Sequence, residues 1–350
     1  MTEKDSTYHS KYMHRCFELA KLGESYVAPN PMVGAVLVYE DRIIGEGYHQ
    51  HYGEAHAEVN CLNSVSAENQ HLISLSTLYV SLEPCAHFGK TPPCADLIIE
   101  HKIPKVFISV QDTFHEVNGK GIERLRANNI EVVIGVLEEE GKELIKHFLF
   151  FHQYKRPYVT LKFAQTKDGY LGIKEQEVKI SNEVSKRYVH QLRAAHQAIL
   201  VGKNTVLSDN PELSVRHWKG KNPIRIILGN ANDIPADFNI FNNTTATIFL
   251  SAENKQALNV NEILTQLYHK NILSVLVEGG ADVLQQFIES NLWNEAHVIS
   301  SSDDISRLST VDCQPNYIKA PEIAGDIIHT ISLENDTIQL LKNTHDLSFT

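Results

Sequence analysis

The stretches that decide the fold are His56-Ala57-Glu58, Pro84-Cys85 and Pro93-Cys94. The first supplies an imidazole and a carboxylate, and each of the others supplies a thiol directly after a proline. One histidine and two cysteines can hold Zn²⁺ while a fourth position stays open for water. We therefore predict that His56, Cys85 and Cys94 bind zinc. Glu58, which is not a ligand in this scheme, would be the catalytic group that moves protons.

The flanking residues predict where these ligands lie. Residues 54–62 and the residues that follow Pro93 both have the pattern of a helix start. A cysteine at a helix N-terminus has a lowered pKa, which favours the thiolate that binds metal. The ligands are thus expected to converge from two helix tips beside one sheet edge. The alternative is a closed structural zinc site with His87 as fourth ligand, which would leave Glu58 without a role.

The combination of H-x-E with two later P-C pairs is the pattern of the zinc nucleobase deaminases. Cytidine-type deaminases usually have two residues between the cysteines, whereas residues 86–93 separate them here. This loop, together with the sequence PNPMVG at 29–34, resembles the bifunctional deaminase/reductase family of riboflavin biosynthesis. The resemblance covers nearly the whole chain and is most specific over residues 1–150.

For the first half, the resemblance implies a cytidine-deaminase-like α/β/α sandwich with a five-stranded sheet. It also implies substrate contacts from a set of polar side chains: Asn30, His49, His87, Lys90 and Asp112. The alternative for His49 and His51 is an ordinary surface histidine, which we favour only for His51. The family has an asparagine two residues after Asp112, where this chain has Phe114.

The second half has no G-x-G-x-x-G after a strand, so a Rossmann nucleotide site is not indicated. It does have Gly279-Gly280 between an apolar strand and a helix. Paired glycines there let backbone N–H groups approach a phosphate, although the same glycines often serve only tight packing.

Further stretches at 162–164, 168–169, 192–194, 198–205 and 209–216 resemble the reductase domain of the same family, with its dihydrofolate-reductase-like α/β fold and its NADPH cofactor. By that resemblance, the cofactor-binding residues are Ala164, Thr205, Asp209, Gly279 and Gly280. The reductase substrate would contact Arg193, Leu213, Arg216 and Glu278. The alternative for the two arginines is an ordinary surface charge.

This half departs from the family in three places. Thr166-Lys167 stands where Ser-Leu is usual, and Lys179-Ile180-Ser181 stands where Trp-Ile-Thr is usual. No glycine occurs between Gly280 and Gly325, where a glycine-bearing loop is common. We expect these changes to alter details of the reductase pocket rather than remove it.

Composition narrows the class of protein. A chain of 350 residues with 42% hydrophobic residues can form two domains, which we place at 1–152 and 153–350. The net charge of −11 argues against a nucleic-acid partner and is compatible with a small phosphorylated pyrimidine substrate. No apolar run suggests a membrane span or a signal peptide. The five scattered cysteines indicate the reducing cytoplasm, and self-association is left open.

The order of expected elements agrees with two α/β domains. In the first half, a helix over 8–22 precedes a hairpin of strands 33–39 and 42–48. Strands 77–82, 106–110 and 130–136 then alternate with helices, the last of which covers 138–151. In the second half we expect strands at 158–164, 198–201, 223–228, 247–250 and 274–277, helices at 182–195 and 281–291, and two strands after 327.

The sequence therefore predicts a bifunctional enzyme of riboflavin biosynthesis. Its first domain would remove the 2-amino group of a diaminopyrimidinone ribosylamine 5′-phosphate with zinc. Its second domain would reduce the ribosyl group to ribityl with NADPH. One alternative is a zinc deaminase of another nucleobase with a degenerate second domain. The other is a nucleotide-binding protein with structural zinc.

Overall fold

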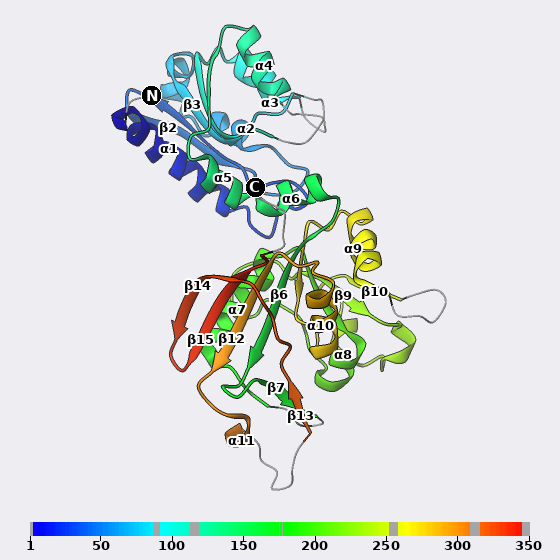
Figure 1. The fold of residues 1–350 in the computed structure, drawn as a ribbon. Helices are drawn as coiled ribbons and strands as arrows, with labels where there is room; N and C mark the ends of the chain where they lie inside the picture. Colours follow the sequence, from blue (N-terminus) through cyan, green and yellow to red (C-terminus); the bar gives the residue numbers. More distant parts are fainter. Residues whose placement is uncertain are drawn as a thin grey trace. The chain divides into compact units, whose positions relative to one another are not determined.

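The computed structural model describes residues 3–86, 92–112, 119–174, 176, 178–251, 258–308 and 316–344. The chain divides into two compact units, Met1–Tyr154 and Lys155–Thr350. Each unit has its own sheet with helices on both faces (Figure 1). Among the described helices, none has the length and apolar character needed to cross a membrane.

Unit 1 contains one five-stranded sheet in the order β2-β1-β3-β4-β5. Its strands are β1 (Gly34–Tyr39), β2 (Arg42–Tyr48), β3 (Thr77–Leu82), β4 (Lys105–Val110) and β5 (Glu131–Ile134). β1 pairs antiparallel with both β2 and β3, whereas β3, β4 and β5 are parallel. The expected hairpin followed by β-α units is confirmed.

The helices of unit 1 are α1 (Glu3–Lys21), α2 (Ala57–Asn63), α3 (Cys94–Glu100), α4 (Lys120–Ala127), α5 (Glu138–Leu144) and α6 (Lys146–Tyr154). Apolar residues of α2, α3 and α4 pack on one face of the sheet, and residues of α1 and α5 pack on the other. The expected α/β/α sandwich is therefore confirmed.

Two details of unit 1 differ from the sequence-based expectation. The single helix expected over 138–151 is broken at Ile145, which leaves the helical region with φ −111° and ψ 23°. Apolar spacing continues through this break, so periodicity alone does not reveal it. A 3₁₀ segment over Ala67–Leu75 was also not expected.

Unit 2 has an eight-stranded sheet in the order β10-β9-β8-β11-β6-β12-β15-β14. Its strands are β6 (Tyr158–Gln165), β8 (Ala198–Gly202), β9 (Ile224–Leu228), β10 (Thr247–Leu250), β11 (Ser274–Val277), β12 (Glu295–Ser301), β14 (Asp326–Leu333) and β15 (Asp336–Lys342). The strands from β10 to β12 are parallel, and the β14–β15 hairpin closes the sheet antiparallel to β12. A separate ribbon pairs β7 (Tyr170–Ile173) with β13 (Tyr317–Lys319).

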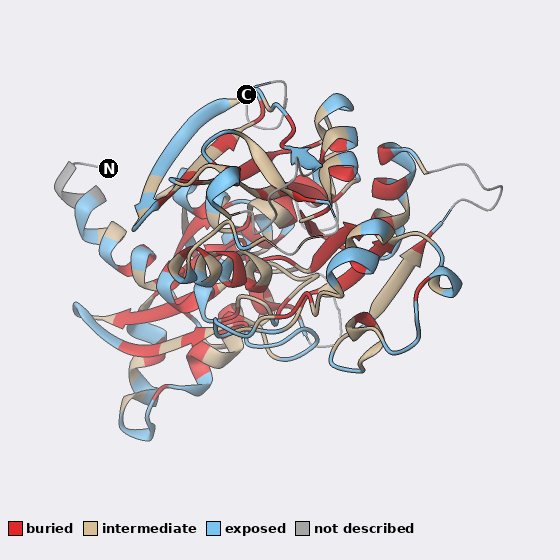
Figure 2. Cartoon of the chain, turned by 90° about the horizontal axis from the view of Figure 1, so that it is seen from below, coloured by how far each residue is buried: buried red, intermediate tan, exposed pale blue. Residues whose placement is uncertain are grey.

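Helices cover both faces of this larger sheet. They are α7 (Glu183–Ala195), α8 (Lys203–Asp209), α9 (Val260–His269), α10 (Ala281–Glu289) and the short α11 (Ile305–Leu308). Residues of α9 and α10 pack on one face, and residues of α7 and α8 pack on the other. In Figure 2 the buried residues gather in the central strands, while the helices carry exposed residues on their outer sides.

β12 was missing from the sequence-based expectation, although polar and apolar residues alternate over 295–298. Glu295 and His297 are both buried on this strand, and His297 Nδ1 lies 2.7 Å from the hydroxyl of Tyr188 on α7. The alternate residues Ala296 and Val298 pack in the apolar cluster of α9 and α10, so this strand is buried on both faces.

Candidate metal centre and second candidate site

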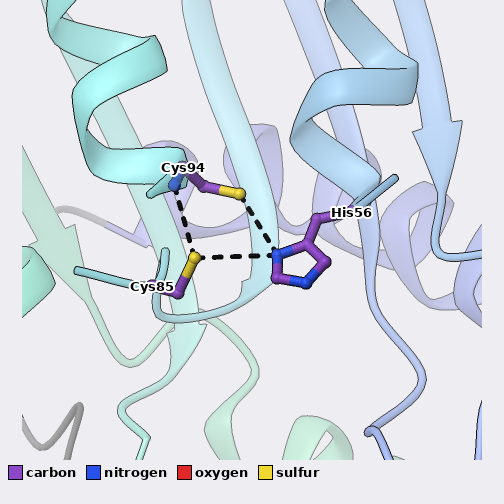
Figure 3. A group of neighbouring side chains, drawn as sticks. All are labelled: His56, Cys85 and Cys94. Carbon is purple, nitrogen blue, oxygen red and sulfur yellow. Dashed lines mark hydrogen bonds between the residues drawn. The ribbon is translucent and has the colours of Figure 1, made fainter. Parts of the chain in front are cut away.

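Three side chains converge in unit 1 at the place that the sequence predicted. The ligand atoms of His56, Cys85 and Cys94 all lie within 4.8 Å of one another. His56 Nδ1 is 3.6 Å from Cys85 Sγ and 3.3 Å from Cys94 Sγ, and all three side chains point toward a common centre (Figure 3). One imidazole and two sulfurs form a donor set that suits Zn²⁺ and leaves a fourth coordination position for water.

Helix starts position two of these side chains. His56 is the N-cap of α2, and Cys94 is the first residue of α3 after the N-cap Pro93. Cys85 follows the end of β3, and its Sγ accepts a hydrogen bond of 3.3 Å from the backbone N–H of Cys94. The expected convergence from two helix tips beside one sheet edge is confirmed.

The charges of the centre favour metal binding and proton transfer. Hydrogen bonding from Cys94, together with the neighbouring ring of His56, lowers the pKa of Cys85. The hydrogen bond to Cys85 and burial raise the pKa of Cys94, so the lowering expected for a cysteine at a helix start occurs at Cys85 and not at Cys94. Burial raises the pKa of Glu58 to about 6, although His56 acts in the opposite direction. Glu58 lies in the first turn of α2 and is only 3% exposed. A buried carboxylate with a pKa near neutrality can both accept and release a proton.

Two of the predicted substrate residues lie beside this centre. The ring of His49 packs edge-on against that of His56, with centroids 5.5 Å apart. His49 Nε2 lies 3.1 Å from Asn30 Nδ2, and His49 Nδ1 lies 3.0 Å from the carbonyl oxygen of Ala55. His49 is buried, so the surface alternative is wrong for this residue. Because both ring nitrogens have protein partners, its evident effect is to orient the amide of Asn30.

The remaining substrate residues of unit 1 are only partly described. Asp112 is buried just after β4, and its backbone N–H donates to Glu83 over 3.2 Å. His87, Lys90 and Phe114 lie outside the described residues. Their predicted effects on the substrate therefore stay predictions.

In unit 2, a buried ionic cluster contains two predicted site residues, Arg193 and Glu278. Arg193 on α7 donates from Nε and Nη2 to the two carboxylate oxygens of Glu278, over 2.7 and 2.9 Å. Lys162 of β6 lies 3.5 Å from the same carboxylate. Burial alone would raise the pKa of Glu278, but the two cations overcome this and hold it at about 2. The Arg193 side chain is only 14% exposed, so the surface-charge alternative is wrong for it.

Arg216 is paired in a different environment. Its Nη1 forms an ion pair with Glu212 and a hydrogen bond of 3.0 Å with Ser214 Oγ, and its side chain is 49% exposed. Its backbone N–H donates to His190 Nδ1 over 3.0 Å. The positively charged side chain can therefore reorient toward solvent while its backbone stays anchored.

The backbone around Arg216 is fixed by side chains from several elements. Arg225 Nε donates to the carbonyl of Glu212, and Arg193 Nη1 donates to the carbonyl of Ser214, over 3.0 and 3.2 Å. Leu213, predicted to contact the substrate, is only 4% exposed and packs in an apolar cluster with Ile199. Its side chain is thus part of the core, which leaves only its backbone for a substrate contact.

Of the predicted cofactor residues, Ala164, Thr205, Gly279 and Gly280 lie at or just after the carboxyl ends of parallel strands. Gly280 is the N-cap of α10, and its N–H donates to the hydroxyl of Thr205 in α8 over 2.9 Å. A Cβ at Gly279 would lie 2.7 Å from Val283 Cβ, so this glycine is needed for close packing. Ala164 is half-buried in β6, and Asp209 is exposed at the end of α8.

These contacts change which backbone N–H groups can bind the phosphate of the cofactor. The N–H of Gly280 already has a protein acceptor, so it is not available in this arrangement. Val283 in the first turn of α10 already donates to the carbonyl of Gly280 over 3.1 Å, which leaves the N–H groups of Ala281 and Asp282 without an acceptor within the helix. The strand ends and the start of α10 therefore suit an anionic cofactor, with Gly279 and Gly280 shaping the turn.

Sequence reasoning did not select three residues that organise these sites. They are Glu83, Lys162 and His190. Glu83 accepts from the backbone N–H of Asp112, Lys162 lies beside Glu278, and His190 accepts from the backbone N–H of Arg216. Lys162 lay in a stretch already recognised, and a lysine within an apolar strand is a usable signal. Glu83 and His190 act on backbone groups far along the chain, which no local pattern reveals.

Comparisons with known proteins agree with this geometry. The family model for the cytidine and deoxycytidylate deaminase zinc-binding region matches residues 6–110, and that for the RibD C-terminal domain matches residues 157–302. The chain is 36% identical to the riboflavin biosynthesis protein RibD of Bacillus amyloliquefaciens, over 97% of this chain and 91% of that protein. It is 39% identical to RibD of Aquifex aeolicus, over 81% of this chain and 84% of that protein.

The chain belongs to the RibD family. A solved structure of a diaminohydroxyphosphoribosylaminopyrimidine deaminase/5-amino-6-(5-phosphoribosylamino)uracil reductase from Thermotoga maritima matches it with a TM-score of 0.84 and 35% identity. The match covers 97% of this chain and 99% of that one. The predicted family and the α/β fold class of both units are thus confirmed, because RibD similarity extends through both units.

Proposed function

We propose that this chain catalyses two consecutive reactions of riboflavin biosynthesis. Residues 1–152 form the zinc-dependent deaminase and residues 153–350 the NADPH-dependent reductase. The convergence of His56, Cys85 and Cys94 beside the buried carboxylate of Glu58 is the observation that carries the first activity. The RibD similarity over both units supports the pairing of the two activities.

In the deaminase, His56, Cys85 and Cys94 hold zinc, and each of the other residues has a separate task. When bound, the metal acts as a Lewis acid that lowers the pKa of a coordinated water toward ~7. Glu58 would accept the two protons that the attacking water loses, one as its oxygen bonds to the carbon bearing the 2-amino group and one as the C–N bond breaks. It would pass one to the ring nitrogen and the other to the departing amine, so that one water is consumed and one ammonia is released.

Substrate positioning falls to polar residues around the centre. Asn30, oriented by His49, presents its amide to the pyrimidine, and Asp112 contacts the sugar. His87 and Lys90 complete the deaminase contacts, with Lys90 as the candidate for the phosphate. A small anionic substrate requires only a few local cations, which agrees with a net charge of −11 and disfavours a nucleic-acid partner.

In the reductase, the cofactor and the substrate approach the carboxyl ends of the parallel strands. Ala164, Thr205, Asp209 and the Gly279-Gly280 turn line the NADPH site, and NADPH supplies the hydride that reduces C1′ of the ribosyl group. Leu213, through its backbone, and Glu278 with its partner Arg193 border the substrate. Arg216 binds the substrate phosphate after it leaves Glu212, because a guanidinium matches a phosphate with paired donors.

One coupled assay tests the proposal. The diaminopyrimidinone ribosylamine 5′-phosphate is incubated with zinc-loaded protein, with and without NADPH, while ammonia and absorbance at the NADPH band are followed. We expect ammonia release that requires zinc, and NADPH oxidation only after deamination. Deamination without any NADPH oxidation would favour a degenerate second domain, and absence of turnover would favour a binding protein.

A cytoplasmic location is part of the same proposal. Cys16 and Cys61 are buried free thiols, and burial raises the pKa of each. The metal cluster also needs Cys85 and Cys94 in the reduced state, which a reducing compartment maintains.

A further inference from the structure

Glu83 lies between the metal cluster and the substrate residues of unit 1, and nothing in the proposed mechanism uses it. It follows β3 directly and precedes Pro84-Cys85 in the chain. Its side chain carries a carboxylate, yet the residue is only 4% exposed. A buried carboxylate is costly unless its oxygens are well satisfied by hydrogen bonds.

In the part of the chain that the structure describes, the donors to this carboxylate are backbone N–H groups. Glu83 Oε2 accepts from the N–H groups of Asp112 and Gly119 over 3.2 and 3.0 Å. Oε1 accepts from the N–H groups of Gly121 and Ile122 over 2.9 and 3.3 Å. Two of these donors belong to the first turn of α4, where the helix dipole also favours a negative charge.

A second observation brings α4 against the cysteine segment. A Cβ at Gly121 would lie 2.0 Å from the carbonyl oxygen of Pro84, so the helix start rests directly on the residue before Cys85. Further along α4, Arg124 donates to the carbonyl of Ala86 over 3.2 Å and pairs with Asp96 over 2.6 Å. The helix is thus fastened to both cysteine-bearing segments.

We propose that Glu83 is a positioning residue of the deaminase: its carboxylate, by binding four N–H groups, fixes Asp112 relative to Cys85. It acts through Asp112 and does not itself touch the substrate. This inference rests on the proposed function, because Asp112 is a substrate contact only if unit 1 is the deaminase. The alternative is that Glu83 merely caps α4 and stabilises the unit.

The test compares Glu83→Gln, Asp112→Ala and the double variant in the full-length zinc-loaded protein. Glutamine keeps the shape, but its NH₂ faces two N–H groups and cannot accept from them. We expect one zinc per chain in every variant and a KM for the pyrimidine substrate raised about tenfold in Glu83→Gln. In the Asp112→Ala background, Glu83→Gln should add little, because both changes remove the same contact.

Glu46→Gln is the matched control. Glu46 on β2 is a partly buried carboxylate held by Arg15 over 2.7 and 2.9 Å, away from the proposed machinery. Its loss should lower the melting temperature without changing KM. If Glu83→Gln behaves in the same way, or if its effect on KM adds in full to that of Asp112→Ala, the positioning role is overturned.

Amide hydrogen exchange makes the test independent of turnover. Exchange at Asp112 and Gly119 should accelerate in Glu83→Gln and stay unchanged in Glu46→Gln. Unchanged exchange at both sites in Glu83→Gln would overturn the positioning role of Glu83. Absence of ammonia release from the wild type would instead refute the proposed function. If Glu83→Gln does not fold, Glu83→Asp takes its place, because it keeps the charge on a shorter side chain. It should change KM and amide exchange in the same direction by smaller amounts. No change in either quantity would refute the positioning role.

Discussion

The metal cluster of unit 1 and the ionic cluster of unit 2 use their polar atoms in opposite ways. His56, Cys85 and Cys94 direct their ligand atoms toward a common point, where a cation would complete them. Arg193 and Glu278 instead satisfy each other with two short hydrogen bonds. The first arrangement can receive a ligand, whereas in the second the charges are already paired within unit 2.

Arg193 and Arg216, both predicted to contact the reductase substrate, lie in different environments. Arg193 is buried and donates two hydrogen bonds to the carboxylate of Glu278. Its removal would leave that buried negative charge with Lys162 as its remaining described cation. Arg216 is half exposed, and the surface pair that it forms with Glu212 contributes little to stability. Arg193 should therefore matter for the fold of unit 2, and Arg216 for its substrate.

The largest expected effect is at the metal cluster. Cys94→Ser should lose zinc and deamination together, because serine is a poor substitute for a thiolate ligand. Reduction of substrate that has already been deaminated should continue near the wild-type rate, since unit 2 has its own core. Zinc content by atomic absorption and the two separate assays measure this.

Cys61→Ala is the control for that change, because Cys61 is also a buried cysteine of unit 1 but lies outside the cluster. It should keep its zinc and its deaminase activity. Loss of both activities in Cys94→Ser would contradict the independence of the two sites.

Arg193→Met should destabilise unit 2 by about 3–5 kcal/mol, since it removes one partner of a buried ion pair. Both tryptophans of the chain, Trp218 and Trp293, lie in unit 2, so urea unfolding followed by tryptophan fluorescence reports on this unit. An Arg193→Met protein that is as stable as wild type but has a raised KM for substrate would mean that Arg193 binds phosphate and is not scaffold.

Arg216→Ala should raise the reductase KM for its phosphorylated substrate at least about tenfold, because charge-assisted hydrogen bonds are lost. The free energy of unfolding should change by no more than about 1 kcal/mol, and the KM for NADPH should stay the same. Lys219→Ala removes another exposed cation from the same loop and serves as control. Equal changes in both KM values would argue against a phosphate contact.

The smallest effect concerns the pH dependence of unit 2. Burial, Arg193, His217 and Arg216 lower the pKa of His190 from 6.5 to about 4. The unfolded chain therefore binds a proton at this residue at higher pH than the folded chain does. The stabilisation is complete above pH 6.5 and is lost progressively as the pH falls toward about 4.

His190→Gln should flatten this part of the stability curve, as measured by tryptophan fluorescence from pH 4 to pH 8. His329→Gln, which removes an exposed histidine from the same unit, should leave the slope as in wild type. A slope that is equally steep in His190→Gln would show that other groups cause the acid sensitivity.

The sequence predicted the metal site well because its signals are local. His56 and Glu58 share one helix start, and each cysteine follows a proline at an element boundary. The helix starts and the strand end that position these side chains can be predicted from prolines and apolar spacing within a few residues of each. The hairpin and the successive β-α units of unit 1 could be predicted for the same reason, since each follows from apolar patterning along the chain.

The second site was harder to predict because its contacts join distant residues. The pair Arg193–Glu278 links a helix to a strand end 85 positions later. Leu213 occurs in a stretch of polar residues, but a left-handed backbone with φ 51° directs its side chain into the core. Such pairings depend on the tertiary fold, and only the three-dimensional structure identifies them.

The most direct test of the account is Glu58→Gln, assayed for zinc content and for ammonia release from the diaminopyrimidinone substrate. Glutamine has the same shape but cannot take up the proton of the attacking water. We predict that zinc stays at the wild-type stoichiometry while deamination falls by about 10²–10⁴-fold. A variant that loses its zinc, or one that keeps wild-type deamination, would contradict the assignment of Glu58 as the group that moves protons beside the metal.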